Sequence, residues 1–238
     1  MVIINETKIE LSIVVPCYNE EKILERTIQY LEKFLFIHRK YFVGEVIFVN
    51  DGSTDNTLGI LEQYRTMGGK TTYSTYSVNM GKGFAVRQGI MFSNYNNILI
   101  LDTDLSVKPD EIINESLLQQ LREDNVWVLA GQRVQVIKQP LYRRFVGNCF
   151  SYLHRILFQW DIIDSQNPFK ILHNIKKEFV SELKIDGFAY DVELLYKAKL
   201  QNIKIKQMSV KYYNNFDSTV TLWKTIRMGL DLFKVRFL

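Results

Sequence analysis

Four short, continuous apolar runs constrain the fold more than any other feature of this sequence. They are rich in Val, Ile and Leu, each is bounded by polar or turn residues, and they occupy residues 11–16, 46–49, 98–101 and 126–130. A weaker run covers residues 71–78. Short runs without polar alternation are typical of strands buried on both faces of a sheet. The sequence therefore predicts a central sheet that other elements cover on both sides.

Helical patterns separate these runs. Leu and Ile recur at helical spacing between residues 24 and 35, Ser53 or Asp55 can cap a second helix, and Pro109 suits the first turn of a third. Alternation of strands and helices favours right-handed βαβ units. We therefore expect an α/β fold with a mostly parallel sheet.

The length of 238 residues suits one large α/β domain with a C-terminal extension. We expect residues 1–215 to form the domain. Residues 216–238 mix large apolar side chains with Lys and Arg, which predicts an amphipathic helix that can lie on a membrane interface. No run of 18 apolar residues is present, so we expect a soluble or peripheral protein.

Charge and cysteine content narrow the class further. Thirty Lys and Arg residues oppose 26 Asp and Glu residues, and the net charge of +4 is too small and too dispersed to indicate nucleic-acid binding. Cys17 and Cys149 form no disulfide framework and no CxxC pair. Two free thiols in a reducing compartment are the expected state.

Polar and acidic residues follow the predicted strands. The ends of the runs carry PCYNEE at residues 16–21, NDGSTD at 50–55, NMGKG at 79–83 and DTD at 102–104. Ligands of an open parallel sheet bind beyond the carboxyl ends of its strands. These segments are therefore the candidate site.

Asp102 and Asp104 are the most informative residues among them. Two carboxylates spaced by one residue at a strand end can share a hard divalent cation that also bridges substrate phosphates. A turn followed by a helix cap explains the same residues without a metal. A haloacid-dehalogenase phosphatase, with Asp102 as nucleophile, is a rival interpretation, but Ser106 stands where that motif has Thr or Val.

The other segments each allow two interpretations. Asp51 precedes Gly52 and can belong to a plain turn, or it can accept a hydrogen bond from a base or a ribose. The stretch Gly81-Lys82-Gly83 can bring backbone and a cation close to phosphates. It is not a Walker loop, and no GxGxxG fingerprint is present.

Taken together, these segments resemble the family 2 glycosyltransferases, which have the GT-A fold. The resemblance rests on SIVVPCYNEE at residues 12–21, VNDGSTD at 49–55 and DTD at 102–104, in this order and at these intervals. The branch that glycosylates polyprenyl phosphates, especially dolichyl phosphate, is the most similar. Its motifs are matched by NMGKGFAVRQG at 79–89, GQR at 131–133, FAYDVELLY at 188–196 and MGLDLF at 228–233.

The resemblance implies a Rossmann-like GT-A sheet flanked by helices and an inverting hexosyl transfer, with Mg²⁺ or Mn²⁺ held by Asp102 and Asp104. The favoured donor is UDP-glucose and the favoured acceptor a polyprenyl or dolichyl phosphate. Another donor such as GDP-mannose, or a non-lipid acceptor, is the alternative. The implied substrate-binding residues are Pro16, Tyr18, Glu20, Asp51, Lys82, Asp102, Arg143 and Arg144, and the implied catalytic residues are Asp104, Arg133, Asp191 and Glu193.

The acceptor determines what else the site needs. A phosphate monoester is ionised at neutral pH, so a lipid phosphate requires no general base. It does require cations, and Arg133, Arg143 and Arg144 are the candidates because guanidinium binds phosphate bidentately. The Arg-dotted apolar segment 143–160 fits either a membrane interface or a helix packed on the core. We expect the enzyme to act at the cytosolic face of a membrane, with a membrane-anchoring subunit as a further candidate partner.

One segment departs from the branch's pattern. Where the branch usually has DTQCGFK, this chain has DSQNPFK at residues 164–170. Pro168 in place of Gly restricts the loop. If the loop contacts the sugar, the donor or the acceptor differs from that of the branch.

Overall fold

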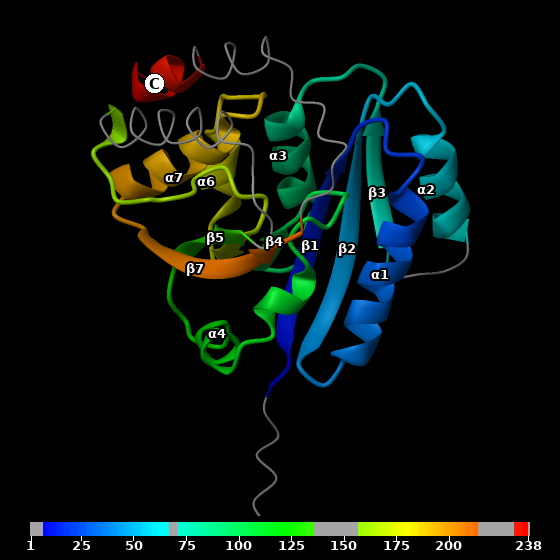
Figure 1. The fold of residues 1–238 in the computed structure, drawn as a ribbon, viewed down its shortest axis with the longest axis horizontal. Coiled ribbons are helices and arrows are strands. Elements are labelled where there is room, and N and C mark those ends of the chain that lie inside the picture. The colour runs from blue at the N-terminus through cyan, green and yellow to red at the C-terminus, as the bar shows by residue number, and fades with distance from the viewer. Residues whose placement is uncertain (1–6, 67–70, 136–156, 214–230, 238) are drawn as a thin grey trace, which may run out of the picture.

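The computed structural model describes residues 7–66, 71–135, 157–213 and 231–237. Figure 1 shows a central twisted sheet with helices on both sides. The elements in chain order are β1 (Ile9–Cys17), α1 (Leu24–Ile37), β2 (Phe42–Asp51), α2 (Thr57–Thr66), β3 (Thr71–Tyr76), α3 (Lys82–Phe92), β4 (Asn97–Ile100), the 3₁₀ helix η1 (Pro109–Ile112), α4 (Glu115–Gln120), β5 (Trp127–Gln135), β6 (Lys170–His173), α6 (Lys177–Ser181), α7 (Tyr190–Leu200) and β7 (Lys204–Tyr212).

The sheet has seven strands in the order β3-β2-β1-β4-β6-β5-β7. The pairs β1–β2, β1–β4, β2–β3 and β5–β7 are parallel. Only β6 runs against its two neighbours, β4 and β5. The expected mostly parallel α/β sheet is therefore confirmed, and each of the four apolar runs falls on a strand.

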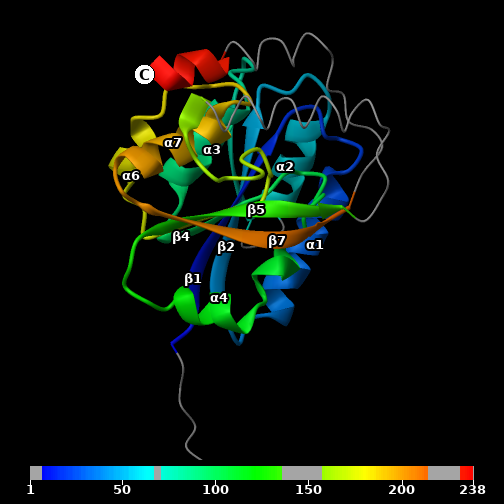
Figure 2. The ribbon, with the colours of Figure 1, turned by 60° about the vertical axis from the view of Figure 1, so that its left-hand side comes forward.

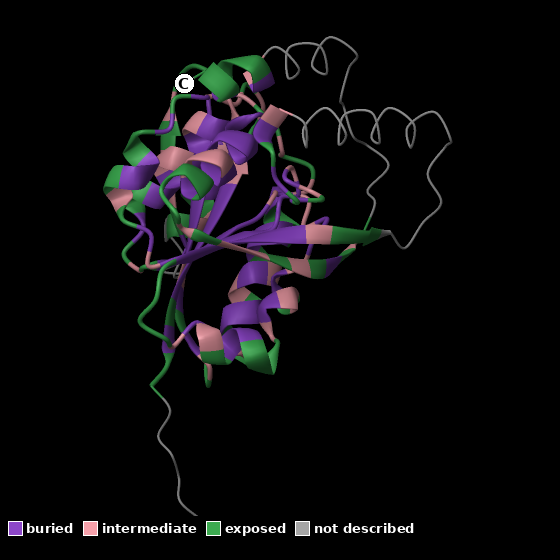
Figure 3. Cartoon of the chain, turned by 90° about the vertical axis from the view of Figure 1, so that its left-hand side faces the viewer, coloured by how far each residue is buried: buried purple, intermediate pink, exposed green. Residues whose placement is uncertain are grey.

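Both faces of the sheet are buried, as the unbroken apolar runs predict. On β1, Val14 packs into the cluster under α3, α6 and α7, whereas Ile13 and Val15 pack into the cluster under α1 and α4. Figures 1 and 2 show these helix groups on opposite faces, and Figure 3 shows that the strands between them are buried. Full burial of each such side chain contributes roughly 1.5–3 kcal/mol.

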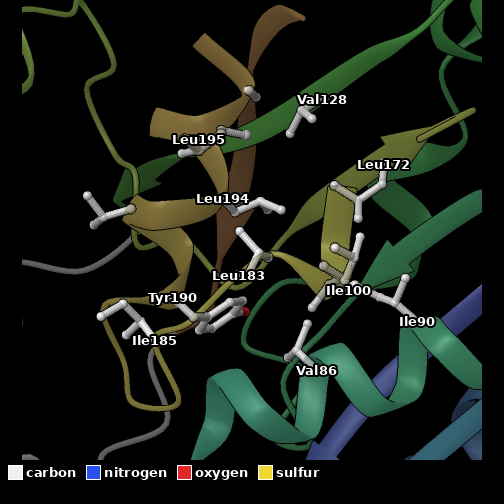
Figure 4. Close-up of a cluster of buried hydrophobic side chains, with 14 of the residues drawn as sticks. Val86, Ile90, Ile100, Val128, Leu172, Leu183, Ile185, Tyr190, Leu194 and Leu195 are labelled. Atoms are coloured by element: carbon white, nitrogen blue, oxygen red, sulfur yellow. The ribbon is translucent and has the colours of Figure 1, made fainter. Parts of the chain in front are cut away.

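Helix α3 lies very close to the sheet. A Cβ on Gly89 would meet Val14 Cγ1 at 2.4 Å, so only glycine allows this approach. Figure 4 shows Val86 and Ile90 of α3 in one cluster with Leu172, Tyr190 and Leu194. The middle of α3 thereby packs against β6 and α7.

Three expectations need correction. The helix expected at Pro109 is the short η1, and α4 begins separately after Asn114, whose side chain caps it through Leu117 N. Strand β3 ends at Tyr76, two residues earlier than the apolar run. Strands β6 and β7 were not predicted, because β6 has only four residues and β7 alternates Lys and Gln with apolar residues.

The C-terminal end of the chain packs on the same core. Residues 231–237 are helical, with Leu232 and Val235 buried in the cluster under α7. Phe233 and Phe237 on the other side of this helix are 47% and 85% exposed. The short helix is therefore amphipathic, whereas residues 216–230 of the expected amphipathic segment lie outside the described residues. Among the described residues, no helix is long and apolar enough to cross a bilayer.

Candidate active site

The loops after β1 and β2 are tied to each other. Asn19, at a positive φ of 57°, receives a hydrogen bond on Oδ1 from Thr54 N at 2.8 Å, and its own N–H donates to Ser53 Oγ at 2.9 Å. Glu20 N donates to Thr57 Oγ1 at 2.9 Å. Because these bonds join residues more than 30 positions apart, they fix Glu20 at the carboxyl edge of the sheet.

Asp51, the last residue of β2, organises the next loop. Its carboxylate accepts hydrogen bonds from Tyr76 Oη at 2.7 Å, Asn79 Nδ2 at 2.9 Å, Met80 N at 2.8 Å and Gly81 N at 3.0 Å. The carboxylate is 3% exposed. Asp51 therefore shapes the loop that leads into α3, which is more than a plain turn requires.

The turn after β4, which carries Asp102 and Asp104, is anchored to the rest of the fold through Thr103. Thr103 Oγ1 donates to Pro16 O at 2.9 Å, and Thr103 O accepts from Thr27 Oγ1 at 2.6 Å. Asp104 Oδ1 accepts from Ser106 N at 2.9 Å. The buried Thr103 thus holds its two acidic neighbours, Asp102 and Asp104, at the surface of the edge.

Lys82 reaches the first of these carboxylates. Its Nζ lies 2.5 Å from Asp102 Oδ1, and the two side chains are 18% and 32% exposed. Burial disfavours the charged ammonium, but the carboxylates of Asp102 and Asp191 outweigh burial and raise the pKa of Lys82. Lys82 is therefore charged at neutral pH.

Glu20 faces the same acidic pair. Partial burial, followed by the negative charges of Asp104, Asp102 and Asp55, raises the pKa of Glu20 to about 7. Burial and Asp102 also raise the pKa of Asp104, against the hydrogen bond from Ser106 N. The edge carries excess negative charge and favours the approach of a cation.

The start of α3 is closed by the segment 184–187, which we call the strap. Gly83 N and Phe84 N both donate to Asp186 O, at 2.6 and 3.3 Å. A Cβ on Gly83 would lie 2.4 Å from Ile185 O. The backbone amides of Gly81 and Gly83 are therefore engaged within the protein, and Lys82 contributes its ammonium.

Glu193 and Arg87 hold the strap. Glu193 is fully buried, and its carboxylate accepts from Lys184 N at 2.8 Å and from Ile185 N at 2.8 Å. Arg87 Nη1 donates to Ile185 O at 2.9 Å, and Arg87 also pairs with Asp186. Glu193, expected to be catalytic, thus lies next to the site with its charge directed to the backbone of the strap.

A buried ion pair lies beside Lys82. Lys170 Nζ is 2.6 Å from Asp191 Oδ1 and donates to Asn167 O at 2.5 Å, and neither charged side chain is more than 4% exposed. Burial raises the pKa of Asp191, and the nearby ammonium groups of Lys170 and Lys82 oppose that shift. Asp191 therefore lies beside Lys82 together with Lys170, for which the sequence suggested no role.

Arg133 makes a bidentate pair with Asp164, through Nε at 2.7 Å and Nη2 at 2.9 Å. Burial favours the neutral form of Asp164, but Arg133 outweighs it and lowers the pKa of this carboxyl. The guanidinium expected to bind the acceptor is thus bound to the segment that departs from the branch's pattern.

The structure places the other expected residues as follows. Pro16 lies at the end of β1, with its carbonyl accepting from Thr103, and Tyr18 is 46% exposed in the loop after β1. Arg143 and Arg144 lie outside the described residues. Cys17 is buried and free, as expected.

The carboxylate oxygens present suit a metal ion that the protein and a substrate hold together, and not one that protein ligands alone enclose. Asp102 and Asp104 flank one turn, and no group of three or more His, Cys, Asp or Glu among the described residues is arranged to ligate a metal. Mg²⁺ in phosphate-transfer sites is commonly held by one or two carboxylates together with substrate phosphates. The residues present therefore fit a divalent cation that the diphosphate of a donor would help to bind.

This fold and edge define the class of the protein, a GT-A glycosyltransferase. The solved glucosyl-3-phosphoglycerate synthase from Mycobacterium tuberculosis, in complex with Mn²⁺, uridine-diphosphate-glucose and phosphoglyceric acid, superposes with a TM-score of 0.69 at 15% identity, over 96% of this chain and 78% of that chain. Mannosyl-3-phosphoglycerate synthase from Rubrobacter xylanophilus gives 0.67 at 14% identity, over 95% and 72%.

The chain belongs to glycosyl transferase family 2, whose domain matches residues 12–176. It is 34% identical to dolichyl-phosphate beta-glucosyltransferase of Mus musculus, over 95% of this chain and 75% of that protein. The Homo sapiens protein of the same name is 32% identical over 95% and 75%. The expected family, the GT-A fold and the enzyme class are confirmed.

Proposed function

We propose that this glycosyltransferase moves glucose from UDP-glucose to dolichyl phosphate in a reaction that depends on Mg²⁺ or Mn²⁺. The acceptor follows from the names of relatives that align over 95% of the chain. The observation that carries the chemistry is the convergence of Asp102, Asp104 and Lys82 on one edge of the sheet.

Asp102 and Asp104 would hold the divalent cation. Such a cation offsets the negative charge that develops on a departing diphosphate. Lys82 supplies a second positive charge at the same edge, and Asp51 keeps the loop before it in place. Glu20 lies in range of both aspartates and completes the donor side of the site.

The acceptor side uses a different set of charges. Dolichyl phosphate is already ionised at neutral pH, so the nucleophilic oxygen needs no base. Asp191, held by Lys170, orients the sugar or the acceptor. Glu193 acts through the strap and Arg133 through the loop that contains Asp164.

Arg143 and Arg144 are the proposed cations for the lipid phosphate. Because Arg133 is already bound bidentately, these two guanidinium groups carry more of the acceptor contact than the sequence alone suggests. The exposed Phe233 and Phe237 bring the end of the chain to the membrane that contains the lipid. We place the reaction at the cytosolic face, where nucleotide sugars are supplied.

A transfer assay tests the proposal. Purified protein with Mn²⁺ or Mg²⁺, a short dolichyl phosphate in detergent and radiolabelled UDP-glucose should move label into the lipid phase. Asp104→Ala should reduce the rate more than about 100-fold, since loss of one transition-state charge contact costs a rate factor of that order. Label transferred only from GDP-mannose, or only to a water-soluble acceptor, would overturn the donor or the acceptor assignment respectively.

A further inference from the structure

Lys82 occupies the carboxylate to which a metal ion would bind. Asp102, a proposed metal ligand, has Oδ1 at 2.5 Å from Lys82 Nζ. An ammonium has three donors and no acceptor, so it occupies a carboxylate without bridging to a cation. A divalent ion that coordinates Asp102 must displace Lys82 from Oδ1, or bind Oδ2 while a like charge remains on the same carboxylate.

Lys82 lies in a confined position, with its side chain 18% exposed. It is the first residue of α3, after Gly81 at a φ of 106°, and the strap packs over this turn. The titratable groups in range of Lys82 are the side chains of Asp102, Asp104, Asp191 and Lys170. Since Asp191 is held by Lys170, Lys82 has few new partners unless an anion enters the site.

The diphosphate of a nucleotide donor is such an anion. The amides of Gly83 and Phe84 at the start of α3 already bond to Asp186 O, and the ammonium of Lys82 is a charged group that α3 can offer to a phosphate. A bound donor diphosphate would therefore give Lys82 a new ionic partner when the metal coordinates Asp102.

We propose that Lys82 is a placeholder cation, which neutralises Asp102 when no donor is bound and passes to the donor's diphosphate when the metal takes Asp102. This inference rests on the metal-dependent donor binding proposed above. Metal alone then binds weakly, because it must displace Lys82, and metal and nucleoside diphosphate strengthen each other's binding. Such coupling is reciprocal and typically amounts to a factor of about 5–150.

The test measures binding and requires no turnover. Mn²⁺ affinity is measured by electron paramagnetic resonance with and without UDP, corrected for Mn²⁺–UDP association in solution. Lys82→Met should bind Mn²⁺ alone about tenfold more tightly than the parent protein, and UDP should then improve Mn²⁺ binding little. Lys82→Arg keeps the positive charge and should retain weak metal binding and strong coupling.

Matched controls separate this exchange from general charge effects. Lys22→Met removes the same charge from an exposed position near the same edge and should leave both affinities within about twofold. Thermal unfolding verifies each variant, and Lys82→Gln replaces Lys82→Met if the latter does not fold.

The outcomes are distinct. If the parent protein binds Mn²⁺ but Lys82→Met binds it equally or more weakly with unchanged UDP coupling, the placeholder role is wrong and the proposed function stands. If no variant binds Mn²⁺ with or without UDP, the metal dependence itself fails, and the placeholder role fails with it.

Discussion

At the scale of single residues, Asp51 does more than its place in an Asn-Asp-Gly-Ser turn suggests. Its carboxylate accepts from a phenol, an amide side chain and two backbone N–H groups, all between residues 76 and 81. Charge-assisted hydrogen bonds are about twice as strong as neutral ones. The sequence located this carboxylate at a strand end, but its partners lie 25–30 residues further on, beyond the reach of any local pattern.

Glu20 makes the stability of the protein depend on pH. Its pKa is raised to about 7, from 4.5, by burial and then by Asp104, Asp102 and Asp55. A carboxyl whose pKa is higher in the folded state contributes stability below about pH 4.5, and that stability is lost as the pH rises through about 7. At pH 8 with EDTA present, Glu20→Gln should therefore unfold at a higher urea concentration than the parent. We expect its free energy of unfolding to be higher by up to about 1–2 kcal/mol after solvent screening.

The gain should shrink as the pH is lowered towards 5. Glu62→Gln, on the exposed side of α2, is the control and should show no such pH dependence. If the difference in stability between Glu20→Gln and the parent is the same at pH 8 and at pH 5, the raised pKa of Glu20 is contradicted.

At the scale of elements, the strap and the start of α3 form one unit. Two N–H groups of α3 bond to Asp186 O, Arg87 returns to the strap from the same helix, and Glu193 of α7 caps two strap amides. The position of Lys82 thus depends on two further elements, the strap and α7, which follow α3 by about 100 residues in the chain.

Gly83→Ala tests this unit. The new Cβ would lie 2.4 Å from Ile185 O and 2.6 Å from Tyr190 Cβ, so the strap must shift. We expect a loss of about 1–3 kcal/mol in the free energy of unfolding, measured by urea denaturation. Gly187→Ala is the matched control in the same strap, since its Cβ would meet only Asp231 Oδ2 at 3.4 Å. Equal losses for both variants would argue against a tight strap.

At the scale of the whole molecule, one hydrophobic cluster joins α3, α6, α7 and the C-terminal helix. Leu232 and Val235 face that cluster, which leaves Phe233 and Phe237 outward next to Lys234. An apolar face with a cation at its border is typical of segments that lie on a membrane interface. The end of the chain therefore packs on the fold and also presents apolar surface.

Changing both Phe233 and Phe237 to Ser should weaken binding to anionic phospholipid vesicles about tenfold or more in sedimentation assays, with little change in the unfolding temperature. Phe36→Ser on α1 removes an equally exposed aromatic residue near the amino ends of the strands and should leave vesicle binding unchanged. If Phe36→Ser weakens binding as much as the double variant does, this helix is not the membrane contact.

The sequence predicted the parallel half of the fold and the acidic edge, because strands buried on both faces leave continuous apolar runs and their ends carry the polar groups. It did not predict β6, or the roles of Lys170 and Asp164. In the sequence, Lys170 resembles a surface lysine, and only the fold shows that it is buried against Asp191. Asp164 pairs with Arg133, which lies 31 residues earlier in the chain. These pairings are set by strand order, which local patterns do not encode.

The reversed direction of β6 determines which of its two adjoining loops lies at the candidate site. Lys170, the first residue of β6, pairs with Ile100 and Ala130, so β6 begins at the edge where the parallel strands end. The loops that follow the parallel strands lie at this edge. Because β6 runs in the opposite direction, the loop that precedes β6 lies there as well. Exchange of residues 164–169 between relatives would therefore alter the edge that carries Asp102 and Asp104, while exchange of the residues after His173 would alter the opposite edge of the sheet.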